Sequence, residues 1–153
     1  MRVALACDHG GLPLKRAVKE ALAAASCEVI DLGTDSPESV DYPDFAHHAV
    51  ELLLNDECDR IVLICGTGIG MSVCANRFRG VRGALCSEPY TARMSRMHND
   101  ANCLILGGRV IGPGIAAEIV DVWMRTPFEG GRHAARLAKI DGLPEKSKDP
   151  SNR

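Results

Sequence analysis

Short apolar segments alternate with longer amphipathic ones through most of the chain, and this alternation restricts the possible folds more than any other feature. Five short segments are mostly apolar throughout, as strands covered on both faces are; they cover residues 2–7, 28–32, 60–65, 82–86 and 103–106. Six segments of helical character accompany them, at residues 12–25, 43–54, 70–77, 89–98, 113–125 and 132–140. The alternation predicts an α/β fold with a parallel sheet, right-handed crossovers and helices on both faces.

The length and the charge of the chain set further limits. Its 153 residues, 46% of them apolar, are enough for one domain with its own core. We predict that residues 1–141 form this domain and that the polar residues 142–153 form a disordered C-terminal tail. A net charge of −2 gives no reason to expect a nucleic acid partner, and the apolar runs are too short to cross a bilayer. Because the N-terminus lacks a signal-peptide pattern, we expect a cytoplasmic protein.

The loops that follow the predicted strands are the expected location of a site, because ligands of such folds bind beyond the carboxyl ends of the strands. One loop, Cys65-Gly66-Thr67-Gly68-Ile69-Gly70, is rich in glycine and opens a helix. Its backbone N–H groups could converge on an anion, although the glycines could also serve only to make a tight turn. The spacing Gly-x-Gly-x-Gly after the third strand differs from the dinucleotide fingerprint, which makes a nucleotide-binding protein the weaker alternative.

Cys65 is the cysteine best placed for chemistry. None of the seven cysteines forms a Cys-x-x-Cys pair, so the sequence indicates neither a zinc site nor a thioredoxin motif. A thiol between a strand and a helix start should ionise more easily than a free one, and its thiolate could act as a nucleophile or a base. A base next to a carbonyl creates an oxyanion, for which the loop amides and the Thr67 hydroxyl could be donors. From spacing alone, a buried structural cysteine remains the alternative.

Three further groups of polar residues could belong to a site, and each has a structural interpretation as well. Asp8 and His9 follow the first strand, where they could bind a sugar hydroxyl or a phosphate, or Asp8 could cap the next helix. His98 ends the fourth helix, where its charge could simply stabilise the helix dipole. Arg132 and Arg136 lie one helical turn apart and could hold a phosphate or form a solvated face.

Eight segments in a fixed order resemble the ribose-5-phosphate isomerase B family, which also includes galactose-6-phosphate isomerase subunits. The match runs from Cys7 to His133, and only the last residues, from Gly142, fall outside it. The segments are Cys7-Asp8-His9-Gly10-Gly11, Asp31-Leu32-Gly33-Thr34, Asp41-Tyr42-Pro43, Cys65-Gly66-Thr67-Gly68-Ile69-Gly70, Cys86-Ser87-Glu88-Pro89-Tyr90, His98-Asn99-Asp100-Ala101-Asn102, Gly108-Arg109-Val110 and Glu129-Gly130-Gly131-Arg132-His133.

The resemblance implies a three-layer α/β/α, Rossmann-like fold with a five-stranded parallel sheet. It also implies an aldose–ketose isomerase that uses no metal and no cofactor and interconverts ribose 5-phosphate and ribulose 5-phosphate through an enediolate. The alternative substrates are six-carbon sugar phosphates, galactose 6-phosphate or allose 6-phosphate. The resemblance further implies a homodimer or a dimer of dimers in which each active site combines residues from two subunits.

The resemblance also implies a role for each matching residue. Cys65 would be the base that moves the proton, and His98 would assist the opening of the sugar ring. Some relatives instead use a Glu of the following helix as base, but Val73 and Cys74 occupy that region here. The remaining implied residues stabilise the enediolate (Thr67 and the loop amides of Gly66, Gly68, Ile69, Gly70 and Met71), hold the sugar (Asp8, Tyr42 and Asn99) or bind the phosphate (His9, Arg109, Arg132 and Arg136).

Overall fold

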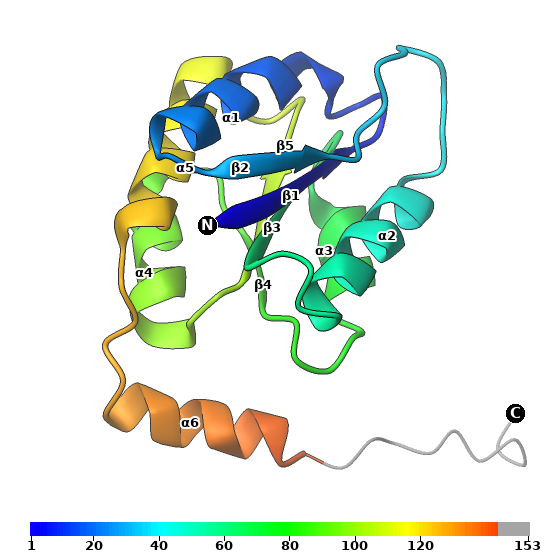
Figure 1. The fold of residues 1–153 in the computed structure, drawn as a ribbon. Helices are drawn as coiled ribbons and strands as arrows, with labels where there is room; N and C mark the ends of the chain where they lie inside the picture. Colours follow the sequence, from blue (N-terminus) through cyan, green and yellow to red (C-terminus); the bar gives the residue numbers. More distant parts are fainter. Residues whose placement is uncertain (144–153) are drawn as a thin grey trace, which may run out of the picture.

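A computed structural model describes residues 1–143 and shows a five-stranded, all-parallel sheet (Figure 1). Its strands are β1 (Arg2–Cys7), β2 (Glu28–Asp31), β3 (Arg60–Cys65), β4 (Gly83–Leu85) and β5 (Cys103–Gly107). Their order across the sheet is β2-β1-β3-β5-β4. The chain proceeds from β1 toward one edge of the sheet and from β3 toward the other, so the switch in strand order falls between β1 and β3. The predicted parallel sheet is therefore confirmed.

Helices cover both faces of the sheet. Strand side chains alternate between the faces, so that Val3 and Leu5 pack with α1 (Leu12–Ala24), α4 (Pro89–Asn99) and α5 (Pro113–Arg125). Ala4 and Leu63 point to the other face and pack with α2 (Tyr42–Leu54) and α3 (Ile69–Ala75). The last helix, α6 (Arg132–Asp141), lies apart from both layers beside the C-terminal end of α4 (Figure 1). The three-layer prediction is therefore confirmed.

Two short elements differ from their predicted bounds at both ends, whereas each of the others agrees or differs by one residue at one end. The strand predicted at 82–86 is Gly83–Leu85, and the helix predicted at 70–77 is Ile69–Ala75. The side chain of Asn76 accounts for the end of α3 and the start of β4. Its Nδ2 donates to the carbonyls of Ser72 and Gly83, and its Oδ1 accepts from the Gly83 N–H. The predicted tail at 142–153 lies outside the described residues apart from its first two, of which Gly142 follows α6.

Lys15 is a buried cation with several polar partners, which the sequence pattern did not indicate. Its side chain is 7% exposed, and its Nζ donates to the Gly33 carbonyl at 3.1 Å and to the Asp35 carboxylate at 2.6 Å. Nζ also lies 3.1 Å from Asp31. Burial alone would raise the pKa of Asp31, but hydrogen bonds from Lys19 and Lys15 outweigh it and hold this pKa below its usual value. Through these hydrogen bonds Lys15 connects α1 to the loop after β2, beside the carboxyl end of β1.

Replacing Lys15 by alanine should lower the free energy of unfolding by about 2 kcal/mol, because the substitution removes a buried ammonium group that donates to the half-buried carbonyls of Gly33 and Thr34 and lies against two carboxylates. Urea denaturation at neutral pH measures the change. The matched control is Arg16→Ala, which removes a 91% exposed side chain lying 3.8 Å from Glu20. This exposed pair should contribute less than about 0.5 kcal/mol. Equal losses in the two variants would contradict the assigned role of Lys15.

Candidate active site

The loops that follow β1, β3 and β5 pack against one another at the carboxyl edge of the sheet. The Gly108 N–H donates to the Cys65 carbonyl at 2.8 Å, and the Arg109 N–H donates to the Gly66 carbonyl at 2.9 Å. A Cβ atom on Gly108 would overlap the carbonyl oxygen of Gly10, and one on Gly10 would lie 2.8 Å from the Gly66 nitrogen. Glycine at these positions therefore lets three loops form one close-packed surface.

Cys65 lies where β3 enters the glycine-rich loop and is 5% exposed. The Gly68 N–H donates to its Sγ at 3.2 Å. Gly68 has a φ of 78°, in the left-handed region that favours glycine, and this conformation starts α3 immediately afterwards. In the same loop, Thr67 Oγ1 accepts a hydrogen bond from the Ile69 N–H at 3.3 Å. The thiol, the hydroxyl and the loop amides that the sequence singled out thus lie within one turn of the chain.

Asp8 and His9 occupy the loop after β1, next to the Cys65 loop. Asp8 Oδ1 accepts a hydrogen bond at 2.9 Å from the N–H of Gly11, the residue before α1, so Asp8 also stabilises the start of this helix. His9 Nδ1 accepts from the Val40 N–H at 3.2 Å. When the imidazole is neutral, its proton therefore sits on Nε2, which is a hydrogen-bond donor for a ligand.

Tyr42 and Arg109 reach the glycine-rich loop from two other parts of the chain. The ring of Tyr42, at the start of α2, lies against Gly70, where a Cβ atom would be 2.6 Å from the ring. The Arg109 side chain, just after β5, passes over Gly66, where a Cβ atom would lie 3.6 Å from its Nε. The Met71 side chain is buried in the core, so only its backbone can face a ligand. The structure therefore gathers most of the predicted residues around Cys65.

His98 and Asn99 lie at the opposite edge of the sheet. Helix α4 starts at the carboxyl edge after β4, runs back along the sheet and ends shortly before β5 begins. Cys65 pairs with Gly107, the last residue of β5, and this five-residue strand is roughly 17 Å long. One chain therefore does not bring His98 and Asn99 to Cys65.

His98 belongs to a cluster with Glu129 and His133, two residues to which the sequence gave no role. The rings of His98 and His133 stack with their centroids 4.2 Å apart. Glu129 Oε2 lies 3.4 Å from His133 Nε2 and 3.9 Å from His98 Nε2. Burial, together with the positive charges of His98 and Arg132, lowers the pKa of His133. Arg132 and Arg136 are exposed on α6 beside this cluster, so the second group of predicted residues also lies together.

Asp100 fixes the end of α4 and with it the direction of His98. Its backbone is left-handed with a φ of 44°. Its carboxylate accepts hydrogen bonds from Arg82 at 2.8 Å and from Arg96 at 2.9 Å. Arg96 is itself only 5% exposed, so a buried side chain holds Asp100, the residue that ends α4 just after His98.

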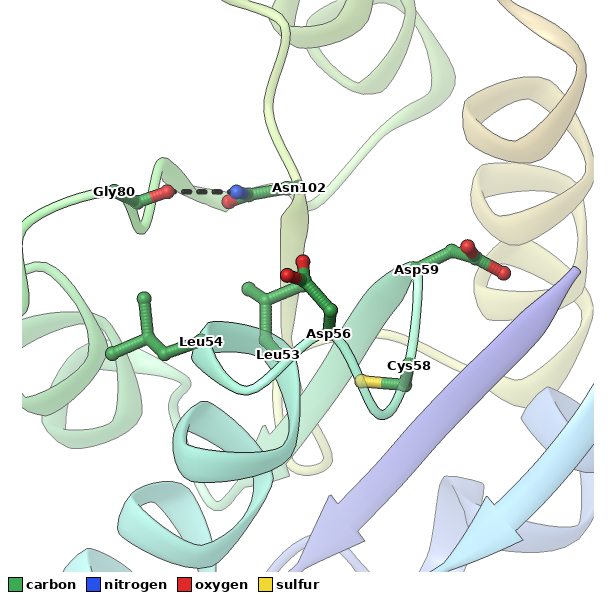
Figure 2. A pocket seen from close by; sticks show the side chains of 7 residues that line it. All are labelled: Leu53, Leu54, Asp56, Cys58, Asp59, Gly80 and Asn102. Atoms are coloured by element: carbon green, nitrogen blue, oxygen red, sulfur yellow. Dashed lines mark hydrogen bonds between the residues drawn. The ribbon is translucent and has the colours of Figure 1, made fainter.

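A pocket of about 410 Å³ lies away from both groups of predicted residues, at the amino edge of the sheet (Figure 2). Several polar groups of its lining, the Asp59 carboxylate and the Asp56 carbonyl among them, already have a partner in Arg2. The Asp59 carboxylate accepts from the Arg2 N–H at 2.6 Å, and the Asp56 carbonyl accepts from the Arg2 guanidinium at 3.1 Å. We therefore assign this pocket no part in the chemistry.

The fold and the site together define a class of protein. It is a three-layer α/β/α protein with a thiol in a glycine-rich loop at the switch in strand order. Side chains suited to a small anionic substrate surround that thiol. Among residues 1–143, no helix is long and apolar enough to cross a membrane.

Comparison with known proteins places the chain within this class. The model of the Ribose/Galactose Isomerase family matches residues 3–140, so the chain belongs to this family and is an aldose–ketose isomerase. The solved structure of Clostridium thermocellum ribose-5-phosphate isomerase B is 51% identical, with a TM-score of 0.89 over 92% of this chain and 95% of that one. Ribose-5-phosphate isomerase B of Escherichia coli is 44% identical over 95% of this chain and 97% of its own length. D-erythrulose-4-phosphate isomerase of Pectobacterium atrosepticum is 36% identical over 92% and 93%.

Proposed function

We propose that the chain interconverts ribose 5-phosphate and ribulose 5-phosphate without a metal or a cofactor. The observation that carries the proposal is the Cys65 thiol, held by the Gly68 N–H at 3.2 Å in a loop that also presents the Thr67 hydroxyl. The similarity to proteins named ribose-5-phosphate isomerase B over nearly the whole chain supports this choice of substrate.

In the proposed reaction the thiolate of Cys65 takes the proton from C2 of the open-chain aldose. This C–H is weakly acidic because its loss moves negative charge onto the carbonyl oxygen. The Thr67 hydroxyl and the amides of the loop donate hydrogen bonds to that oxygen in the enediolate. The proton then returns to C1, and the proton of the C2 hydroxyl ends on the oxygen of C1. The sum is an isomerisation, so the step needs no redox cofactor.

The other residues around Cys65 bind the two ends of the substrate. Asp8 and Tyr42 hold sugar hydroxyls, for which a carboxylate and a phenol are suitable partners. His9, through its Nε2–H, and Arg109 bind the phosphate. We assign these roles to side chains that reach the same loop surface in one chain.

A second subunit supplies the remaining groups in our proposal. His98, Asn99, Arg132 and Arg136 lie at the far edge of their own chain, which makes them available to a neighbouring copy. Large apolar side chains are exposed near the carboxyl edge, and surfaces of this kind commonly mark an interface; they include Ile69, Val73, Leu85, Tyr90 and Val110. We propose a homodimer, or a dimer of dimers, built from the domain at residues 1–141 and active in the cytoplasm.

An isomerase assay on the purified protein tests the function. Ribose 5-phosphate should be converted faster than galactose 6-phosphate or allose 6-phosphate, and the rate should not fall in the presence of a chelator. A clear preference for either six-carbon substrate would replace the proposed substrate while keeping the reaction. Absence of turnover on every sugar phosphate would contradict the proposal.

Replacing His98 by alanine should affect cyclic substrates selectively, because we assign His98 to ring opening. Turnover of ribose 5-phosphate should fall by about 100-fold, the lower range for loss of a proton-transfer group. Erythrose 4-phosphate cannot close into a furanose, because its O4 carries the phosphate, and its turnover should fall much less. Initial rates relative to the unmodified protein measure both effects. Equal losses on the two substrates would indicate a binding role for His98 instead.

A further inference from the structure

The β2–α2 loop, residues 32–41, connects an edge strand to the next helix (Figure 1), and the proposed reaction gives it no role. The loop nevertheless contacts the candidate active site at two points. Near its start, the Thr34 N–H donates to the Cys7 carbonyl at 3.0 Å. Near its end, the Val40 N–H donates to His9 Nδ1 at 3.2 Å. The loop is therefore attached to the end of β1 and to a residue just beyond it that we assign to phosphate binding.

Lys15 holds the start of the β2–α2 loop. Its Nζ donates to the carbonyls of Gly33 and Thr34, both at 3.1 Å, and to the Asp35 carboxylate at 2.6 Å. Three successive loop residues thus share one ammonium group whose side chain is 7% exposed. A Cβ atom on Gly33 would lie 2.6 Å from Cys7 Sγ and 3.3 Å from Lys15 Cε, so the start of the loop is also closely packed.

Local hydrogen bonds continue from this anchored start toward Val40. The Ser36 N–H donates to Thr34 Oγ1 at 3.1 Å, and the Glu38 N–H donates to Ser36 Oγ at 3.2 Å. Such side-chain bonds to the backbone two residues further on stabilise a turn conformation. Because they end only two residues before Val40, the anchor and the N–H that faces His9 belong to one ordered segment.

The Val40 N–H determines how His9 faces a ligand. A neutral imidazole carries a proton on only one of its nitrogens, and a backbone N–H can only donate. The bond from Val40 therefore favours the tautomer with the proton on Nε2, and it also fixes the orientation of the ring. In this state His9 presents a donor to a phosphate oxygen. The other tautomer would present a lone pair, which repels a phosphate oxygen.

We propose that the β2–α2 loop positions His9 for the phosphate of the substrate through the Val40 N–H, and that Lys15 is the positioning residue that anchors this loop. Lys15 acts through the loop and does not itself bind substrate. The effect on phosphate affinity rests on the proposed function of His9, whereas the tautomer of His9 does not depend on it.

Val40→Pro tests the contact directly, because proline has no N–H to donate. The matched control is Val40→Ala, which keeps the N–H and loses only side-chain atoms. Nitrogen-15 NMR of the full-length protein with labelled histidine, at about pH 8.5 where imidazoles are neutral, separates the two tautomers. His9→Asn identifies the His9 signals by their absence. The unmodified protein and Val40→Ala should show the Nε2–H form alone, and the Nδ1–H form should appear beside it in Val40→Pro.

The same samples measure the effect on binding. In Val40→Pro the affinity for inorganic phosphate, titrated by NMR, should fall by about 5-fold, the usual effect of losing one hydrogen bond. The KM for ribose 5-phosphate should rise by a similar factor while kcat changes by less than about twofold. A proton on His9 Nδ1 in the unmodified protein, or an unchanged tautomer in Val40→Pro, would overturn the positioning role. A changed tautomer with unchanged phosphate affinity would overturn the role in phosphate binding.

Lys15→Met tests the anchor, because it keeps the apolar stem and removes the ammonium group. It should mix the His9 tautomers and raise KM as Val40→Pro does. The matched control is Lys19→Met, because Lys19 donates at 2.7 Å to Asp31, the residue before the loop, and this variant should change neither quantity. Asp35→Ala removes a 93% exposed partner of Lys15 and should give a smaller shift in the same direction, even if Lys15→Met does not fold.

An unchanged His9 tautomer and phosphate affinity in Asp35→Ala and in folded Lys15→Met would overturn the anchoring role of Lys15. Equal effects in Lys15→Met and Lys19→Met would also contradict it. A protein that shows the expected tautomers and binds phosphate but has no isomerase activity would contradict the proposed function and leave the positioning of His9 intact.

Discussion

Replacing Cys65 by alanine should lower kcat by about 1,000-fold and change KM little, because general-base proton transfer contributes roughly 100- to 10,000-fold. The substrate contacts assigned to Asp8, His9 and Arg109 remain in the variant. The fold should also survive, since the substitution removes one buried sulfur atom at the end of β3. Steady-state kinetics with ribose 5-phosphate measure the effect, and thermal unfolding confirms that the variant is folded.

Cys74→Ala is the matched control for this experiment. Cys74 is a free, half-buried cysteine on α3, the helix that the Cys65 loop opens, and our proposal gives it no role. This variant should retain kcat within a factor of about two, as expected for a residue outside the chemistry. Iodoacetamide should inactivate the unmodified protein and Cys74→Ala alike, and ribose 5-phosphate should protect both. A Cys65→Ala protein with unchanged kcat would exclude Cys65 as the base.

The sequence predicted the regular elements well because each is marked by strong local signals. The bounds of β1 and β3 agree with the prediction to the residue, since each is an apolar run that ends at a polar or glycine-rich loop. Helix α5 agrees as well, with Pro113 at its first position. The predicted bounds of the short elements α3 and β4 were less accurate, because the Asn76 side chain ends α3 and starts β4 through hydrogen bonds to Ser72 and Gly83, which apolar periodicity does not report.

The sequence predicted one half of the candidate site better than the other. Asp8 and Cys65 follow strands that became neighbours, so the rule for parallel sheets was enough to bring them together. The burial of Lys15, by contrast, depends on acceptors in the loop after β2, and helical periodicity does not report such acceptors. Glu129 and His133 gave only a weak signal, a spacing of four residues within one matching segment. Their contact with His98 depends on how α6 packs beside α4.

The distance between the two halves of the candidate site within one chain leads to the second prediction. Cys65 lies at the carboxyl edge of the sheet and His98 at the amino edge, about one strand length apart. In a symmetric dimer each active site would combine Cys65 of one subunit with His98 of the other. Two different inactive variants could then restore one intact site when they share a dimer.

We expect a mixture of Cys65→Ala and His98→Ala proteins, unfolded and refolded together, to recover roughly a quarter of the unmodified activity. Random pairing places about half of the dimers in the mixed form, and each mixed dimer holds one intact site and one doubly damaged site. Each variant refolded alone is the control and should stay inactive. Size-exclusion chromatography must show that both variants dimerise, and differently tagged subunits must show that they exchange. If exchange occurs without recovery, Cys65 and His98 do not meet across the interface. The proposal of a shared site is then wrong, whereas the proposed isomerase activity is unaffected.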